Sequence, residues 1–125
     1  MLGDKDPKVT IAVKDMAAAQ KFYEGTLGLK KGEGGQPGAL VFKSGGSSVF
    51  IYESKFAGTN QATAATWVLD DVDGTVRELK GKGVPFEHYA DLPGVTLEGD
   101  VHVARDMRAA WFKDPDGNIL ALVSQ

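Results

Sequence analysis

A weak internal repeat is the feature that most constrains how this chain can fold. Thr10 aligns with Thr66 at an offset of 56 residues, and ALVFK at 39–43 aligns with AAWFK at 109–113 at an offset of 70. These identities are few, but they fall within the same order of predicted elements. Self-similarity of this kind indicates two copies of one supersecondary unit.

The first copy is predicted to contain a strand, a helix and a hairpin. Apolar residues alternate with polar or small ones at 8–13, which is typical of a half-buried strand. Asp15 is a suitable N-cap for the following helix, and Gly28 is a suitable stop. The predicted elements are a strand at 8–13, a helix at 16–27, and strands at 39–44 and 47–54 joined by Gly45 and Gly46.

The second copy repeats this order and adds an insertion. Asp71 is a suitable cap for its helix, and Asp-Pro-Asp-Gly at 114–117 is strong turn chemistry that predicts a closing hairpin. An insertion at 93–106 accounts for the change of offset, and one further residue in the closing turn aligns Phe50 with Ala121. The predicted elements are a helix at 72–82 and strands at 62–70, 84–90, 111–113 and 119–123.

Length and composition predict one soluble domain. With 125 residues, we expect a single domain over 1–125, with module one at 1–57 and module two at 62–125. The absence of cysteine excludes disulfides and thiolate metal sites. A net charge of −3, with basic residues scattered singly, argues against nucleic acid or membrane as a partner. The charged start is unlike a signal peptide, so a cytoplasmic location is expected.

The last predicted strand is apolar on both faces, so both faces should avoid bulk water. Because successive side chains alternate, Leu120 and Leu122 should pack under a helix while the others face a cleft. Across the hairpin, Phe112 should share the helix side and Trp111 the cleft side. The expected cleft-facing residues of this strand are Ile119, Ala121 and Val123.

The same alternation defines a candidate ligand surface. Aromatic side chains with a polar tip suit a planar organic ligand, although they equally suit a filled interior. Lys8 is either an anchor for a carboxylate or phosphate, or a side chain that simply reaches water. Trp67 shares the parity of Ala65 and Leu69 and is expected in the core beneath the second helix. The candidate ligand-binding residues are Lys8, Thr10, Phe50, Tyr52, Thr66, Trp111 and Ala121.

Two βαβββ units across nearly the whole chain resemble the vicinal oxygen chelate superfamily, which includes glyoxalase I, bleomycin and fosfomycin resistance proteins, and extradiol dioxygenases. The resemblance is carried by VTIAVKDMAAAQKFYEGTLGL at 9–29, WVLDDVDGTVRELKGKGV at 67–84 and AAWFKDPDGNILALV at 109–123. It implies an α+β fold in which the sheets curl around a shared cleft, with the helices outside and the cleft commonly completed by dimerisation.

Metal-using members of that superfamily hold the ion at three cleft-facing positions, and some members use a fourth. The resemblance places the three positions at Lys8, Ala64 and Ala121 and the fourth at Phe50. Alanine and phenylalanine offer no donor atom, and lysine ligates a metal only when it is deprotonated. The ordinary carboxylate and imidazole shell therefore cannot form here, and neither a metal nor another cofactor is expected.

Three functional hypotheses remain open from the sequence. The leading one is a metal-independent homodimeric protein, resembling the bleomycin-resistance branch, that sequesters a planar or aromatic, antibiotic-like ligand in its cleft. The second is a lyase, isomerase or dioxygenase-like enzyme with an atypical site near His88, His102 and Glu98. The third is a partner or regulatory module whose cleft is vestigial.

Overall fold

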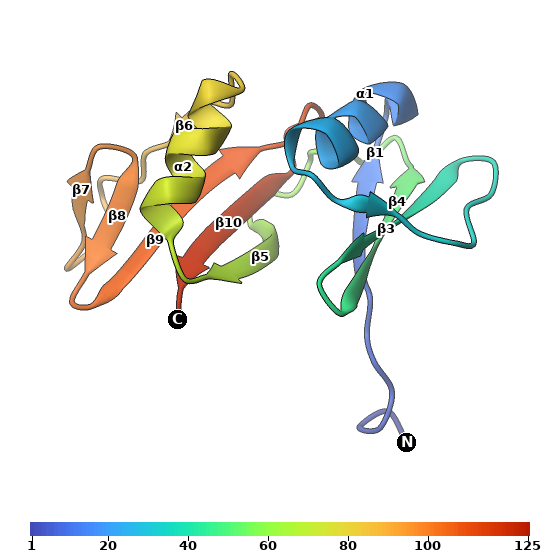
Figure 1. Ribbon diagram of the computed structural model, residues 1–125, viewed down its shortest axis with the longest axis horizontal. Helices are drawn as coiled ribbons and strands as arrows, with labels where there is room; N and C mark the ends of the chain where they lie inside the picture. The colour runs from blue at the N-terminus through green and yellow to red at the C-terminus, as the bar shows by residue number, and fades with distance from the viewer.

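Two mixed β-sheets, each accompanied by a helical segment, lie next to each other along the long axis of the molecule (Figure 1). The computed structural model of the protein describes residues 1–125. The first module contains β1 (Val9–Val13), α1 (Met16–Gln20), η1 (Lys21–Thr26), β2 (Lys30–Lys31), β3 (Ala39–Ser44) and β4 (Ser47–Glu53). The second contains β5 (Thr63–Leu69), α2 (Val72–Gly81), β6 (Phe86–Glu87), β7 (Thr96–Glu98), β8 (Val101–Ala104), β9 (Met107–Lys113) and β10 (Ile119–Ser124). The predicted α+β arrangement of two βαβββ-like modules is confirmed.

Strand pairing follows the same plan in both modules. The first sheet has the order β1-β4-β3-β2, and the second contains the corresponding order β5-β10-β9. Thr10 pairs with Phe50 on parallel strands, and Thr66 pairs with Ala121 in the same way. Residues that the internal alignment treats as equivalent therefore have equivalent partners in the two sheets.

Both predicted helix caps are present. Asp15 accepts a hydrogen bond from the backbone N–H of Ala18 at 3.0 Å, and Asp71 accepts one from Gly74 at 2.8 Å. A Cβ on Gly74 would lie 2.2 Å from the Asp71 carboxylate, so this cap requires glycine. The first predicted helix is α-helical only as far as Gln20 and continues as a π-helical turn, which the apolar spacing does not reveal.

The predicted strand at 84–90 is wrong over most of its length, because only the two residues of β6 form a strand. The outer edge of β9 is shared between two partners. β6 pairs with β9 at Phe112 and Trp111, whereas β8 pairs with β9 from Ala109 onward toward the start of that strand. The inserted segment thus forms a β7–β8 hairpin that extends the second sheet and takes the edge that a longer β6 would need.

The core lies between the helices and the sheet faces that they cover. Its apolar side chains include Ile11, Val13, Val49 and Ile51 from the first sheet, Phe112, Leu120 and Leu122 from the second, and Val72, Val76 and Leu79 from α2. Trp67 packs against this cluster, as expected, and its Nε1 donates a hydrogen bond to Ser44 Oγ of the first module at 2.9 Å. None of the helices has the length and apolar character needed to span a membrane.

A buried polar network joins the modules at the closing turn. The Tyr23 hydroxyl donates to Asp114 Oδ2 at 2.7 Å, and Asn118 Nδ2 donates both to the same oxygen and to the backbone carbonyl of Ala12, at 2.8 Å each. Burial and the Asp114 carboxylate raise the pKa of Tyr23, so its hydroxyl stays protonated and acts as a donor. The turn that closes the β9–β10 hairpin therefore also fixes the second module to the first.

Candidate functional site

The sheet face of module one that points away from its helix is largely uncovered. Phe50 is 36% exposed and Tyr52 is 43% exposed, while their strand neighbours Val49 and Ile51 are buried in the core. This exposure follows from alternation, because residues of opposite parity on β4 point to opposite faces of the sheet. We call this surface, formed by Lys8, Thr10, Val41, Phe50 and Tyr52, the open face.

A pocket lies on the open face beside Phe50 and Val41. Its volume is about 430 Å³, which is within the usual range for small-molecule sites. The Lys8 Nζ atom lies 5.6 Å from the centre of the Phe50 ring, a cation–π distance. The complete lining is Lys8, Lys31, Gly32, Glu33, Gly34, Val41, Lys43, Ser48 and Phe50.

A smaller cavity of about 160 Å³ continues the open face toward the second module. Thr10 and Tyr52 form its wall on the first module. Ala64, at one of the superfamily's metal positions, and Ile119 form part of its wall on the second module. The open face therefore reaches the line along which the two sheets meet.

The corresponding face of module two is filled by its own side chains. Trp111 points away from the fully buried Phe112, as expected from strand alternation, and its ring is met edge-on by His102 at 4.9 Å and Tyr89 at 5.3 Å between ring centroids. Its Nε1 donates to Thr63 Oγ1 at 3.2 Å. We call the surface formed by Tyr89, His102, Trp111 and Ala121 the filled face.

The filled face leaves little of the last strand accessible. Ala121, the register partner of Trp111, is only 2% exposed, and Ile119 is also buried, whereas Val123 is partly exposed. Thr66, on the neighbouring strand, remains exposed. The apolar second face of β10 is thus covered mainly from within the chain.

His102 serves the filled face as a neutral side chain. It is 3% exposed, and its Nε2 accepts a hydrogen bond from the backbone N–H of Tyr89 at 2.8 Å. An accepting Nε2 places the single ring proton on Nδ1, which is buried without a hydrogen-bond partner. Burial is the main cause that lowers the pKa of His102. The nearby Ala109 backbone acts to raise this pKa, and His88 lowers it by a smaller amount.

The metal site of the superfamily does not fit the residues of this chain. Lys8, Phe50, Ala64 and Ala121 provide no carboxylate or imidazole at the four positions, and no group of three or more histidine, aspartate or glutamate side chains is placed to hold a metal ion. No chemical step is therefore assigned to a metal here.

The alternative site suggested near His88, His102 and Glu98 is not assembled. His88 Nε2 lies 2.7 Å from Asp100, which also forms an ion pair with Lys80 at 2.6 Å. These two partners, Lys80 first, lower the pKa of Asp100. Glu98 instead lies 3.6 Å from Arg108, so the three residues have separate partners. Sequence reasoning grouped them by proximity along the chain, which does not fix the direction of their side chains.

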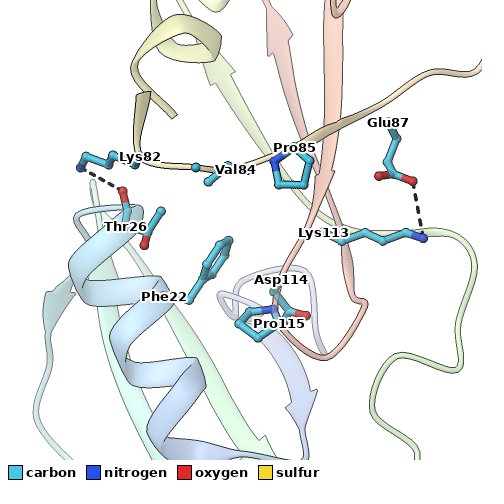
Figure 2. Close-up of a pocket in the computed structure, with 10 residues that line it drawn as sticks. Phe22, Thr26, Lys82, Val84, Pro85, Glu87, Lys113, Asp114 and Pro115 are labelled. Atoms are coloured by element: carbon cyan, nitrogen blue, oxygen red, sulfur yellow. Dashed lines mark hydrogen bonds and ion pairs between the residues drawn. The ribbon is translucent and has the colours of Figure 1, made fainter. Parts of the chain in front are cut away.

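A second sizeable pocket, of about 370 Å³, lies between η1 and the segment after α2 (Figure 2). Its charged groups are already paired. Lys82 Nζ donates to the backbone carbonyl of Thr26 at 3.1 Å, and Lys113 forms an ion pair with Glu87 at 3.5 Å, as the dashed lines in Figure 2 show. Few polar groups are left to recognise a ligand there.

Several residues of the two faces and of the open-face pocket were not singled out from the sequence. Val41 and Lys43 belong to a strand that the sequence predicted, and their alternation with Phe42 was a usable signal for the cleft side. Lys31 gave no such signal, because β2 has only two residues. Tyr89 fell in the predicted strand at 84–90, of which only Phe86 and Glu87 form a strand.

Comparison with known proteins agrees with this architecture. The profile of the Glyoxalase/Bleomycin resistance protein/Dioxygenase superfamily matches residues 7–122. The chain therefore belongs to this superfamily. The comparison with curated proteins gives no match.

Solved structures share the fold at low sequence identity. A putative glyoxalase family protein from Bacillus anthracis has a TM-score of 0.70 and 18% identity, with 100% of this chain and 99% of that chain covered. A glyoxalase/bleomycin resistance protein/dioxygenase from Alicyclobacillus acidocaldarius has a TM-score of 0.70 and 21% identity, with coverages of 99% and 94%. A fosfomycin resistance protein from Listeria monocytogenes has a TM-score of 0.72 and 16% identity, with coverages of 98% and 93%. At these identities the likeness establishes the fold alone.

Proposed function

We propose that this protein binds a planar or aromatic, antibiotic-like small molecule on the open face and sequesters it without a metal and without a chemical step. The observation that carries the proposal is the exposure of Phe50 and Tyr52 on a face where superfamily members hold a metal. Phe50 itself occupies one of the metal positions. An aromatic ring in place of a metal ligand favours stacking over coordination.

The energetics of the open face suit this role. Two large aromatic side chains exposed on one surface leave apolar area in water that a flat ligand would cover. Stacking of a ring of nucleobase size contributes about 1 to 3 kcal/mol, and further affinity comes from a preformed pocket. Thr10 supplies a hydroxyl beside the rings, and Thr66 and Trp111 are proposed as contacts on the side of module two.

An enzymatic role receives less support. Asp100 and Glu98 are held in ion pairs, and the Nε2 of His102 is occupied by a backbone donor. General acid–base catalysis needs a titratable group within reach of the substrate, and none of these groups lines the open-face pocket. A vestigial cleft in a regulatory module predicts no small-molecule binding at all, so a binding experiment separates that hypothesis from ours.

We also propose that the protein is a homodimer whose second copy deepens the ligand site. Phe50 and Tyr52 on the open face and Val68 on β5 are large apolar side chains that remain exposed, and exposed apolar surface marks an interface or a ligand site. Light scattering should give a mass near twice 13.3 kDa. A monomer mass at a high micromolar concentration would refute the dimer and leave the open face to the ligand alone.

The ligand proposal is tested by a calorimetric screen of planar antibiotics and aromatic acids, performed with chelator present. Phe50→Ala should weaken binding of any hit about tenfold, since it removes a stacking surface. Leu92→Ala is the control, because Leu92 is also a large exposed hydrophobic residue, at 43% against 36% for Phe50, but lies outside the open face and its pocket. The proposal fails if no compound binds, or if both variants weaken binding equally.

A further inference from the structure

Three lysines gather around the open-face pocket without an ion-pair partner. Lys8 precedes β1, Lys31 lies on β2, and Lys43 lies on β3, so three separate segments bring them to one pocket. Glu33 is the only acidic residue that lines the pocket, and it forms no ion pair with any of them. The pocket therefore carries an excess of positive charge in a chain whose net charge is −3.

Two basic residues of the second sheet, by contrast, do have acidic partners. Lys113, which lines the pocket between η1 and the segment after α2, is paired with Glu87. Arg108 on β9 forms two hydrogen bonds of 2.8 Å with the Asp73 carboxylate. Like charges that converge without a counterion repel one another, and an anion placed between them removes that repulsion.

The aromatic floor of the pocket restricts the shape of such an anion. Phe50 and Val41 are register partners and present one continuous apolar surface. Lys8 Nζ, 5.6 Å from the centre of the Phe50 ring, lies within ion-pairing reach of a charged group attached to a ring that contacts Phe50. A ring and an anionic group in one rigid, flat molecule match both features of the pocket.

We propose that the open-face pocket selects an aromatic anion, with its ring against Phe50 and Val41 and its anionic group toward Lys8 and Lys43. This inference rests on the proposed function and specifies the class of its ligand. The same arrangement disfavours cationic aromatic compounds, because their charge would meet the three lysines.

The test uses three flat naphthalene compounds that differ in charge: 2-naphthoate, 2-naphthamide and 2-naphthamidine. Calorimetry with chelator present should show 2-naphthoate binding about five- to tenfold more tightly than the amide, with the amidine weakest. Raising the NaCl concentration from about 20 mM to about 500 mM should weaken only the anion, because salt screens exposed charges.

Variants that each remove one positive charge show which lysines cause the preference for the anion. Lys8→Gln and Lys43→Gln should each weaken 2-naphthoate about threefold and leave 2-naphthamide unchanged. Lys21→Gln, on the exposed surface of η1, makes the same change of net charge away from the pocket and should affect neither compound. If the amide or the amidine binds as tightly as the anion, the ligand class is wrong while the proposed binding function stands. If none of the three binds at millimolar concentration, both are overturned.

Discussion

The two modules share one backbone plan and use the corresponding sheet face in opposite ways. Val41 pairs with Phe50 in module one, and Trp111 pairs with Ala121 at the corresponding place in module two. Each pair joins a large aromatic residue to a smaller one, but the large residue is on β4 in the first module and on β9, the equivalent of β3, in the second. Both modules therefore keep a contact between a large and a smaller side chain on neighbouring strands, but the strands that carry the large and the smaller residue are exchanged.

The inserted hairpin explains why only one face is filled. β8 lies beside β9 and supplies His102, whose ring is nearly perpendicular to that of Trp111, and Tyr89 from the segment after β6 packs against Trp111 in the same way. In module one the only outer neighbour of β3 is the two-residue β2, so nothing comparable covers Phe50. The large aromatic side chain of this face is therefore packed from within the chain in module two and left exposed in module one.

The largest difference between the faces should be seen in stability. Trp111→Ala should lower the free energy of unfolding by about 2 to 4 kcal/mol, because it removes a ring packed against His102 and Tyr89. Phe50→Ala should cost less than about 1 kcal/mol, since the exposed ring has few contacts to lose. Urea unfolding of both variants measures the difference, and equal losses would break the distinction between an open and a filled face.

A smaller effect concerns the pH dependence of stability. Burial lowers the pKa of His102 in the folded state below its ordinary value of 6.5, so the unfolded chain binds more protons as the pH falls below 6.5. The stabilising contribution of neutral His102 is therefore complete above that pH and declines below it. His102→Gln keeps an oxygen that can accept from Tyr89 and removes this titration.

The measurement is the slope of the unfolding free energy between about pH 6.5 and pH 5 for both proteins. The wild-type protein should lose more stability across this window than His102→Gln. His88 is present in both, and the lowered pKa values of Asp73 and Asp100 act at lower pH, near and below 3.8. Identical slopes would show that the His102 side chain is not held neutral in the filled face.

The smallest expected effect is that of metal removal. Since Lys8, Phe50, Ala64 and Ala121 stand at the superfamily's ligand positions, a chelator should leave the Tm of the purified protein unchanged. Elemental analysis should accompany the melting experiment. One tightly held zinc, nickel or iron ion per chain, with a lower Tm after its removal, would contradict the proposed stacking site.

The sequence predicted the parts of this fold that depend on local chemistry and on the repeat. The Asp15 and Asp71 caps and the Gly45–Gly46 hairpin were confirmed, since capping and tight turns are governed by residues close in sequence. Strand alternation placed Thr10 and Phe50 on one face, and the two residues are register partners on β1 and β4.

The remaining features depend on contacts between segments distant in sequence. The filling of module two's face needs β8 beside β9, and no local pattern specifies which edge an inserted hairpin will join. The same placement shortened β6 and buried Ala121, whose sequence context predicted only that it would face a cleft. The candidate site was accessible through strand parity, but its lysines converge only once the sheet has formed.

The central claim is that module one's open face, rather than the pocket between η1 and the segment after α2, holds a ligand without metal. The most direct test is an NMR titration of the wild-type protein with 2-naphthoate and chelator, following the backbone amide signals. We predict that the largest shifts occur at Thr10, Val41, Phe50 and Tyr52 and that Phe50→Ala reduces them. Shifts confined to the pocket between η1 and the segment after α2 (Figure 2), or their absence at millimolar 2-naphthoate, would contradict the claim.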